Sequence, residues 1–472
     1  MQLTAIVGDA TATFRQGLVD LFAETGCSGS GVVTEEQFGA VLAGLKGVAS
    51  RASLTAFVAM VEASDSDAQV LERGGQRHRF KEASTKTWLT PFGLAEVSRR
   101  YYQPDLGGRG VIPLDEACGM VDRYMTPDVE EMVAFAAALM VPREVETLLG
   151  KALPQGPSAT AIHRVVHDVG GFVEAHETQV EDAMTSEAPL STDGDLLVIS
   201  QDGVTVPMRE EGPRCGRPPE RPGVCEHASS ATRWREAGVG TVSIYANAGP
   251  HERPERVDGR VFARMPEPHM ASVSRQMEGL VWELAQRRSF REIVLICDGK
   301  PSLWKDLAAI PTYATATQIL DVYHALEHLS RAAEAIFGKS STKGRRWYQR
   351  HRHRLLHEDD GVGASIRSLR YHLRALRPGS ERAEVVRRVI QHFGSNTHRM
   401  RYATFRARGL PIGSGPVEAA CKTVVGSRLK RSGMRWSQEG GQNILNLRTA
   451  VKSNRWDTLW GVYQGTSLRE AA

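Results

Sequence analysis

Two apolar segments of this 472-residue chain each come shortly before an aspartate that is followed by a glycine. The first runs from Leu196 to Asp202, and the second runs from Ile293 to Asp298. A short, unbroken apolar run bounded by turn residues is typical of a strand that is buried on both faces of a sheet. We therefore expect each strand to deliver one carboxylate to an α/β sheet. The alternative for each aspartate is an ordinary Asp-Gly turn after a strand.

The segments around these two strands follow a definite order. Strand-like runs lie at 238–246 and 259–265, a helical segment covers 269–288, and a short strand-like run ends at Asp321. His324 and His328 then lie four residues apart, on one face of the following helix. Three strands, helix, strand, helix, strand, helix is the order of an RNase H-like domain. It predicts an α/β fold with a mixed five-stranded sheet flanked by helices, in two parts: 195–330 and 409–472.

A third carboxylate lies in the stretch 409–436, where a glycine-rich turn leads into a helix opened by Pro416. Glu418 falls in the first turn of that helix, where an acid also complements the helix dipole. Glu418 lies 120 residues after Asp298, which lies 96 residues after Asp202. Two aspartates and a glutamate on rigid elements are the minimal carboxylate set for two Mg²⁺ ions. Basic residues follow the glutamate: Lys422, Arg428, Lys430, Arg431 and Arg435.

The distribution of charge, rather than the net charge, indicates a polyanionic partner. The whole chain has a net charge of only +4, but residues 338–408 contain 18 Lys and Arg against 5 Asp and Glu, an excess of 13. Six histidines lie in the same window. An excess this large favours a nucleic-acid surface over an ordinary solvated face. We expect 331–408 to be a basic, all-helical insertion in the α/β core, with Arg345 and Arg346 among its DNA contacts.

The N-terminal part of the chain is predicted to be a mainly helical DNA-binding region. Residues 1–74 have apolar residues at helical spacing, 75–125 suggest a small β module, and 126–185 suggest three short helices. Ser158 is a candidate N-cap for the last of these helices. In a helix-turn-helix, the side chains facing the DNA groove would be Thr160, His163, Arg164 and His167. The alternative is a plain helical spacer.

Cysteine usage and apolar content bear on metal sites and on the membrane. The small β module has no cysteine pair, so we predict no metal there. Cys215, Cys225 and His227 match no standard zinc spacing and lie in a segment rich in Pro, Gly and Arg, which favours a loop. No unbroken apolar run approaches the roughly 20 residues of a membrane span, and the N-terminus lacks a signal-peptide pattern. We expect no membrane partner and a cytoplasmic, nucleoid-associated protein.

The motifs of the C-terminal part resemble those of a known family. They are Asp202-GVTVPMRE, Trp234-REAGVG, Cys297-Asp298-Gly, Asp321-VY-His324, Gly409-LPIGSGPVEAACK-Thr423 and Ser432-GMRW-Ser437. As a set, they are similar to the motifs of the Kra-type insertion-sequence DDE transposases, which are distantly Mutator-like. The resemblance is strong over about 195–460. It is weaker over 75–185, where such proteins often have a cysteine-bearing module that this chain lacks.

The resemblance implies roles for individual residues. Two Mg²⁺ ions, for which Mn²⁺ can substitute, would be held by three carboxylates: Asp202, Asp298 and Glu418. His324 would act near the scissile phosphate, as part of an Asp-x-x-His signature with Asp321. His328 is a weaker candidate for the same site. The basic residues that follow Glu418 would hold the DNA backbone, as would Arg164 in the N-terminal region.

The resemblance also implies a reaction and an assembly. A transposase of a bacterial insertion sequence binds the terminal inverted repeats of its element, cuts the DNA at the ends and joins them to target DNA. Because two ends are processed together, a homodimer or a larger homo-oligomer is expected. Two alternatives stay open. One is an RNase H-like DNA nuclease or resolvase, which cuts without joining, and the other is a domesticated DNA-binding protein without activity.

Overall fold

The computed structural model describes residues 3–26, 34–186, 190–191, 193–209, 233–246 and 249–471. The chain divides into two compact units. The first contains Met1–His176 together with Leu459–Ala472, and the second contains Glu177–Thr458. The candidate site predicted from the sequence lies in the second unit.

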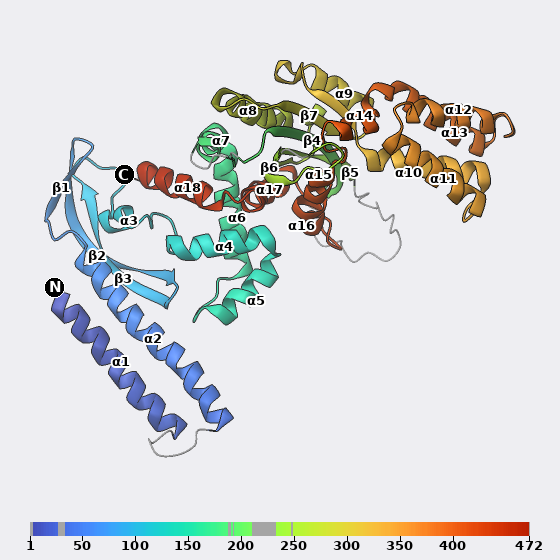
Figure 1. Cartoon of the computed structure of the whole chain (residues 1–472). Helices are drawn as coiled ribbons and strands as arrows, with labels where there is room; N and C mark the ends of the chain where they lie inside the picture. Colours follow the sequence, from blue (N-terminus) through green and yellow to red (C-terminus); the bar gives the residue numbers. More distant parts are fainter. Residues whose placement is uncertain are drawn as a thin grey trace, which may run out of the picture. The chain divides into compact units, whose positions relative to one another are not determined.

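The first unit begins with a helical hairpin of α1 (Leu3–Thr25) and α2 (Glu35–Ala63), drawn in blue in Figure 1. A capping box between Thr34 and Gln37 starts α2. The two helices pack closely, because a Cβ atom at Gly44 would lie only 2.1 Å from Leu21. Within the described residues, α2 is the one helix that is long and apolar enough to cross a bilayer. We did not expect this from the sequence, because polar residues interrupt its apolar run.

A three-stranded antiparallel sheet follows the hairpin, in the order β1 (Val70–Arg73), β2 (Gln76–Thr90), β3 (Gly93–Pro104). Side chains of β3 alternate between buried and exposed, as expected for a sheet with one covered face. Its buried side packs with α2 and the short helix α3 (Pro113–Ala117) around Trp88 and Val97.

Three helices complete the first unit together with the end of α18 (Trp456–Ala471): α4 (Pro127–Leu139), α5 (Pro142–Ala152) and α6 (Ala159–Ala175). The Ser158 hydroxyl caps α6 by accepting a hydrogen bond from the Ala161 amide at 3.3 Å. Ile162 and Val165 of α6 are buried. The four side chains that we predicted to face a DNA groove are exposed: Thr160, His163, Arg164 and His167.

The second unit contains a five-stranded mixed sheet in the order β6-β5-β4-β7-β8. Its strands are β4 (Leu196–Met208), β5 (Arg233–Tyr245), β6 (Arg256–Arg264), β7 (Glu292–Cys297) and β8 (Thr317–Leu320). β4 pairs antiparallel with β5 and parallel with β7, and β7 pairs parallel with β8. The predicted α/β class, with a mixed five-stranded sheet flanked by helices, is confirmed. The narrower RNase H-like assignment stays a prediction.

Alternate side chains of the central strands point to opposite faces, and each face has its own core. Leu197 and Ile199 pack with α8 (Ala271–Arg287) and α9 (Pro301–Ala308). Leu196 and Val198 lie in the core that also contains α10 (Val322–Phe337). α7 (Glu177–Ser186) joins α8 through an ion pair of Glu177 with Arg275. Three short 3-10 helices connect other elements: Pro268–Met270, Pro311–Tyr313 and Thr397–Arg399.

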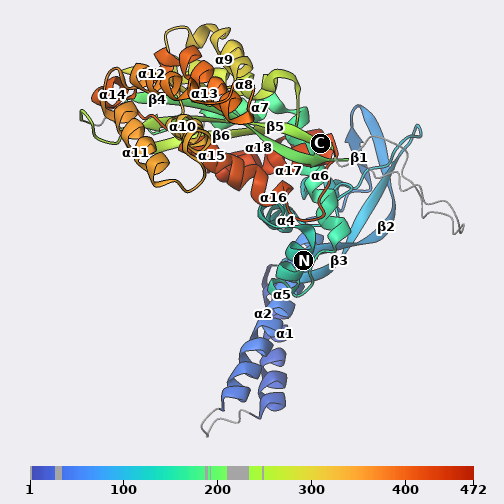
Figure 2. The same ribbon diagram turned by 90° about the vertical axis from the view of Figure 1, so that its right-hand side faces the viewer.

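The segment between α10 and the last part of the unit is helical, as predicted for 331–408. It contains α11 (Thr342–His357), α12 (Gly361–Leu373), α13 (Glu381–Ser395) and α14 (Tyr402–Ala407). Figures 1 and 2 show α11 and α13 beside α10. Trp347 and Phe393 of this segment are buried in the same core as the sheet. The segment is therefore packed onto the sheet core rather than joined to it by a hinge.

The C-terminal part of the unit returns to the sheet through short helices. α15 (Gly415–Ala420) passes into a π-helical turn, Cys421–Gly426, and then into α16 (Ser427–Leu429). The sequence predicted a helix opened by Pro416, and the π-helical turn within this segment is a feature that the pattern did not indicate. Such turns widen the helix by one residue and often lie at functional sites. α17 (Gln438–Lys452) packs against β6.

Candidate active site

The register of the parallel strands brings three aspartates to one level of the sheet. Ile199 of β4 lies opposite Leu295 of β7, an offset of 96 residues. Asp202 and Asp298 each lie three residues further along, so their sequence spacing equals the register of the ladder. Cys297 lies opposite Leu320 of β8, so the next residues, Asp298 and Asp321, are level in the same way. Three neighbouring parallel strands thus place one aspartate each at the same level: Asp298 and Asp321 directly follow β7 and β8, and Asp202 lies within β4.

The strand that carries Asp202 is longer than we predicted. We expected it to end at the aspartate, but β4 continues to Met208. The reason is that β4 has a different partner on each side. β7 has ended by this level, while β5 continues, with Asp202 opposite Val239. At Asp202, β4 is therefore paired with β5 on one side only, and its other side is open toward Asp298.

Asp202 is half-buried, and its surroundings make its negative charge costly. Burial raises the pKa of the Asp202 carboxyl, and the nearby Asp298 charge raises it further, against the hydrogen bond from the Gly203 amide. That amide donates to Oδ1 at 2.7 Å. Cys421 Sγ lies 3.8 Å from Oδ2. Two neighbouring carboxylates of this kind are suited to a shared divalent cation.

Glu418 approaches the aspartates from α15. Its side chain is 39% exposed and lies 3.7 Å from Lys422 Nζ. Cys421, one turn later in the same helical segment, contacts Asp202. Burial raises the pKa of Asp321, and the charge of Glu418 raises it further. Glu418 therefore lies close enough to Asp321 to act on its charge, and its neighbour Cys421 contacts Asp202.

The three carboxylates do not gather as tightly as the ligands of a single ion. Across the described residues, the one group of three ligand side chains whose donor atoms lie within 4.8 Å of one another consists of histidines. A two-ion site is wider, because ions about 3.5–4 Å apart have ligands about 2 Å beyond each of them. Carboxylates spread over a distance of about 8 Å are compatible with such a pair.

Asp321 is buried and anchors the glycine-rich turn that precedes Glu418. Its Oδ2 accepts a hydrogen bond from the Ser414 hydroxyl at 2.8 Å. Its Oδ1 accepts from the amide of Tyr323 at 3.0 Å, which caps α10, and from the amide of Ser414 at 3.4 Å. Both oxygens are thus engaged by protein donors. In this arrangement, Asp321 positions the start of α15 rather than serving as a metal ligand.

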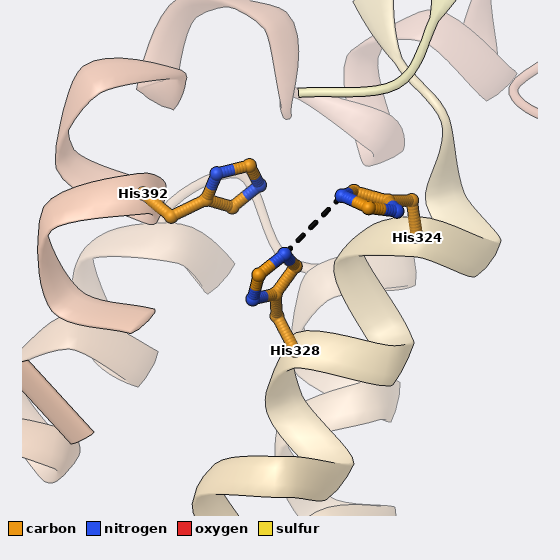
Figure 3. A group of neighbouring side chains, drawn as sticks. All are labelled: His324, His328 and His392. Carbon is orange, nitrogen blue, oxygen red and sulfur yellow. Dashed lines mark hydrogen bonds between the residues drawn. The ribbon is translucent and has the colours of Figure 1, made fainter. Parts of the chain in front are cut away.

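His324 and His328 lie one turn apart on α10, as their spacing predicted, and their Nε2 atoms are 3.2 Å apart. A third histidine, His392 of α13, completes a group that we did not predict (Figure 3). No local sequence pattern identifies it, because it lies 68 residues after His324. A Cβ atom at Gly299 would lie 2.0 Å from the His392 ring. The histidine group therefore adjoins the loop that carries Asp298.

A cavity of about 530 Å³ opens beside the two level aspartates. Asp202 and Asp298 line it, together with both partners of the Lys300–Glu236 ion pair, which are 2.5 Å apart. The Lys300 amide also donates to Asp298 Oδ1 at 3.1 Å. The cavity lining thus combines acidic groups with two cationic groups, Arg235 and Lys300, which suit an anionic substrate.

Most of the basic residues predicted to hold DNA are accessible. Lys422, Lys430 and Arg435 are exposed, as are Arg345 and Arg346 of α11 and Arg164 of α6, and Arg431 is partly exposed. Arg428 is the exception, since it is 2% exposed and lies over the Trp436 ring at 5.3 Å. A buried guanidinium cannot reach a phosphate in this conformation, so the predicted contact by Arg428 is wrong for this structure. Cys215, Cys225 and His227 fall outside the described residues.

Comparison with known proteins provides little further evidence about the function of this site. No family model matches the sequence, and no curated protein matches it. A solved structure, the Drosophila P element transposase strand transfer complex, aligns with 72% of this chain and 80% of its own chain at 15% identity. The TM-score of that alignment is 0.23, which is too low to establish a shared fold. The functional argument therefore rests on the residues themselves.

Proposed function

We propose that this chain is a DNA transposase with an RNase H-like catalytic core, which cleaves and joins DNA strands by a DDE mechanism. One observation carries the proposal. The 96-residue spacing of Asp202 and Asp298 equals the β4–β7 register, and Cys421, three residues after Glu418, contacts Asp202. Asp202 and Gly203 lie within β4 and pair with β5, so an Asp-Gly turn after the strand does not account for Asp202. The strand order β6-β5-β4-β7-β8 suits the same core.

The donor set fits hard divalent cations. Asp202, Asp298 and Glu418 offer only carboxylate oxygens, which Mg²⁺ prefers and Mn²⁺ also accepts. Burial raises the pKa of Asp202, and the nearby charges of Asp298 and Glu236 raise it further, so a bound cation would stabilise its charged form. When bound, two Mg²⁺ ions would activate the attacking oxygen and stabilise the leaving oxygen of an in-line displacement. Asp321 would hold Glu418 in place through Ser414.

DNA would bind along the basic part of the same unit and along the N-terminal region. The excess of 13 positive charges in 338–408 supplies the non-specific attraction to phosphates. The proposed backbone contacts are Arg345, Arg346, Lys422, Lys430, Arg431, Arg435 and Arg164. A transposase of a bacterial insertion sequence would bind its terminal inverted repeats and a target as a homodimer or larger assembly. It would work in the cytoplasm at the nucleoid.

The proposal is tested by a cleavage-and-joining assay in Mg²⁺ or Mn²⁺, with labelled DNA taken from either side of the coding sequence. We expect wild type to nick the element ends and join them to a target. Asp202→Asn, Asp298→Asn and Glu418→Gln should bind the DNA and do neither. Glu283→Gln is the matched control, because Glu283 is a carboxylate on α8 that forms an ion pair with Arg287 one turn away.

The outcomes separate the proposal from its two alternatives. Cleavage without joining would indicate a nuclease or resolvase on the same core. Binding without cleavage by wild type would indicate a non-catalytic DNA-binding protein. Cleavage that survives all three substitutions would show that the carboxylate assignment is incorrect.

A further inference from the structure

The histidine group has the shape of a metal site. His324 and His328 come from α10 and His392 comes from α13, so two helices supply the three rings. Figure 3 shows the three imidazoles turned toward a common point between the helices. One ligand nitrogen from each ring lies within 4.8 Å of the other two, and all three side chains are half-buried.

The hydrogen bonds of the group are incomplete. The Nε2 atom of His392 is buried and has no hydrogen-bond partner. The Nε2 atoms of His324 and His328 face each other at 3.2 Å, so at most one of them can be a donor. Within the described residues, no carboxylate is hydrogen-bonded to any of the three rings. A buried polar atom without a partner is costly, and a bound cation would satisfy it.

The protonation states suit metal binding. Burial, and then His392, His324 and Arg331, lower the pKa of His328 to about 4. Burial, and then His324, lower the pKa of His392 against the charge of Asp298. These rings are therefore neutral near pH 7 and have lone pairs to offer. Simple packing of the rings explains the arrangement less well than metal binding does. The His328 and His392 rings do stack, with centroids 4.2 Å apart, but an apolar ring would stack there without leaving an unsatisfied nitrogen.

We propose that His324, His328 and His392 bind one divalent transition-metal ion, for which Zn²⁺ is the best fit. Three imidazole nitrogens favour zinc over Mg²⁺, which prefers oxygen ligands. In a tetrahedral site with Zn–N distances of about 2.0–2.1 Å, the nitrogens lie about 3.3 Å apart. The 3.2 Å separation of the His324 and His328 nitrogens already matches that value. The fourth position would be open to water.

The location of this ion gives it a positioning role. His392 packs against Gly299, the residue after Asp298, so the ion would tie α10 and α13 to the loop that carries that aspartate. His324 would then be a ligand rather than a group that transfers protons. The binding of the ion does not depend on the proposed transposase activity. Only its effect on cleavage rests on that activity.

The test is a metal titration of the full-length protein after removal of metals with a chelator, without DNA. We expect wild type to bind one Zn²⁺, and bound Co²⁺ to give the visible absorption of a tetrahedral site with nitrogen and oxygen ligands. His328→Ala and His392→Ala should each weaken Zn²⁺ binding more than about 100-fold, beyond the roughly 10–100-fold that loss of an outer partner costs. Far-UV circular dichroism checks that both variants are folded.

A second histidine pair in the same unit provides the control. His353 and His357 also stack one turn apart, on α11, but they belong to no three-residue ligand group among the described residues. His353→Ala should retain full zinc affinity. Wild-type protein that binds no zinc, or zinc lost on Cys225→Ser but kept on His392→Ala, would overturn the proposal. A protein that binds zinc and never cleaves DNA would overturn the transposase function and leave this site intact.

Discussion

Asp321 should be among the most sensitive positions of the chain, and the size of the effect follows from its contacts. Replacement by alanine removes the cap of α10, which costs about 0.5–2 kcal/mol. It also leaves the buried Ser414 hydroxyl without its acceptor, which costs about 1–3 kcal/mol. We expect Asp321→Ala to lower the free energy of unfolding by about 2–4 kcal/mol.

Asp321→Asn removes the charge of the side chain but keeps its hydrogen bonds, so it distinguishes the two contributions to stability. Asparagine is as good a cap as aspartate, and its amide group can donate to the Ser414 hydroxyl. The loss of stability should therefore stay below about 1 kcal/mol. Because Ser414 begins the helix of Glu418, Asp321→Ala should also lower the kcat of strand cleavage more than it weakens DNA binding.

The assay is urea unfolding of the full chain at one pH, with cleavage kinetics on the same preparations. Asp360 is the matched control, since it is an N-cap residue of α12 whose side chain makes no cap hydrogen bond. Asp360→Ala should cost less than about 0.5 kcal/mol. A double-mutant cycle of Asp321→Ala with Ser414→Ala should show coupling. Equal losses for Asp321→Ala and Asp321→Asn would refute the reasoning.

Three further predictions concern neighbouring parts of the second unit. Gly299→Ala places a Cβ atom 2.0 Å from the His392 ring, so it should weaken zinc binding and slow cleavage without affecting DNA affinity, as measured by titration and kinetics. His351 is buried, and burial followed by nearby arginines lowers its pKa to about 4. In the unfolded chain, His351 binds a proton near pH 6.5, whereas in the folded chain it binds that proton only near pH 4. Stability should therefore fall as pH falls through this window, by at most about 3 kcal/mol, and His351→Gln should flatten that part of the pH profile of unfolding. Lys430→Ala should reduce the slope of log K against log salt by about 1 with unchanged stability, whereas Arg428→Ala should lower stability and leave the slope unchanged. The opposite pattern in a salt-dependent binding assay would restore Arg428 as a DNA contact.

The five-stranded sheet shows how much of the fold the local sequence pattern can predict. Apolar runs such as those before Asp202 and Asp298 mark buried strands, because only strands with both faces covered tolerate such runs. The order of strands and helices then predicted a mixed five-stranded sheet. The pattern did not predict where β4 ends, since its length past Asp202 depends on the pairing with β5. Pairing between distant segments is not visible in either segment alone.

The candidate site was likewise predictable from the sequence in part only. The sequence by itself determined which carboxylates lie on or directly after buried strands, the 96-residue spacing between Asp202 and Asp298, and the shared helix face of His324 and His328. Only the tertiary structure decided that this spacing equals a ladder register, that Arg428 is buried, and that His392 of α13 completes a histidine group beside Gly299. The physical reason is that periodicity records contacts within one element. Burial, register and ligand groups arise from packing between elements far apart in the chain.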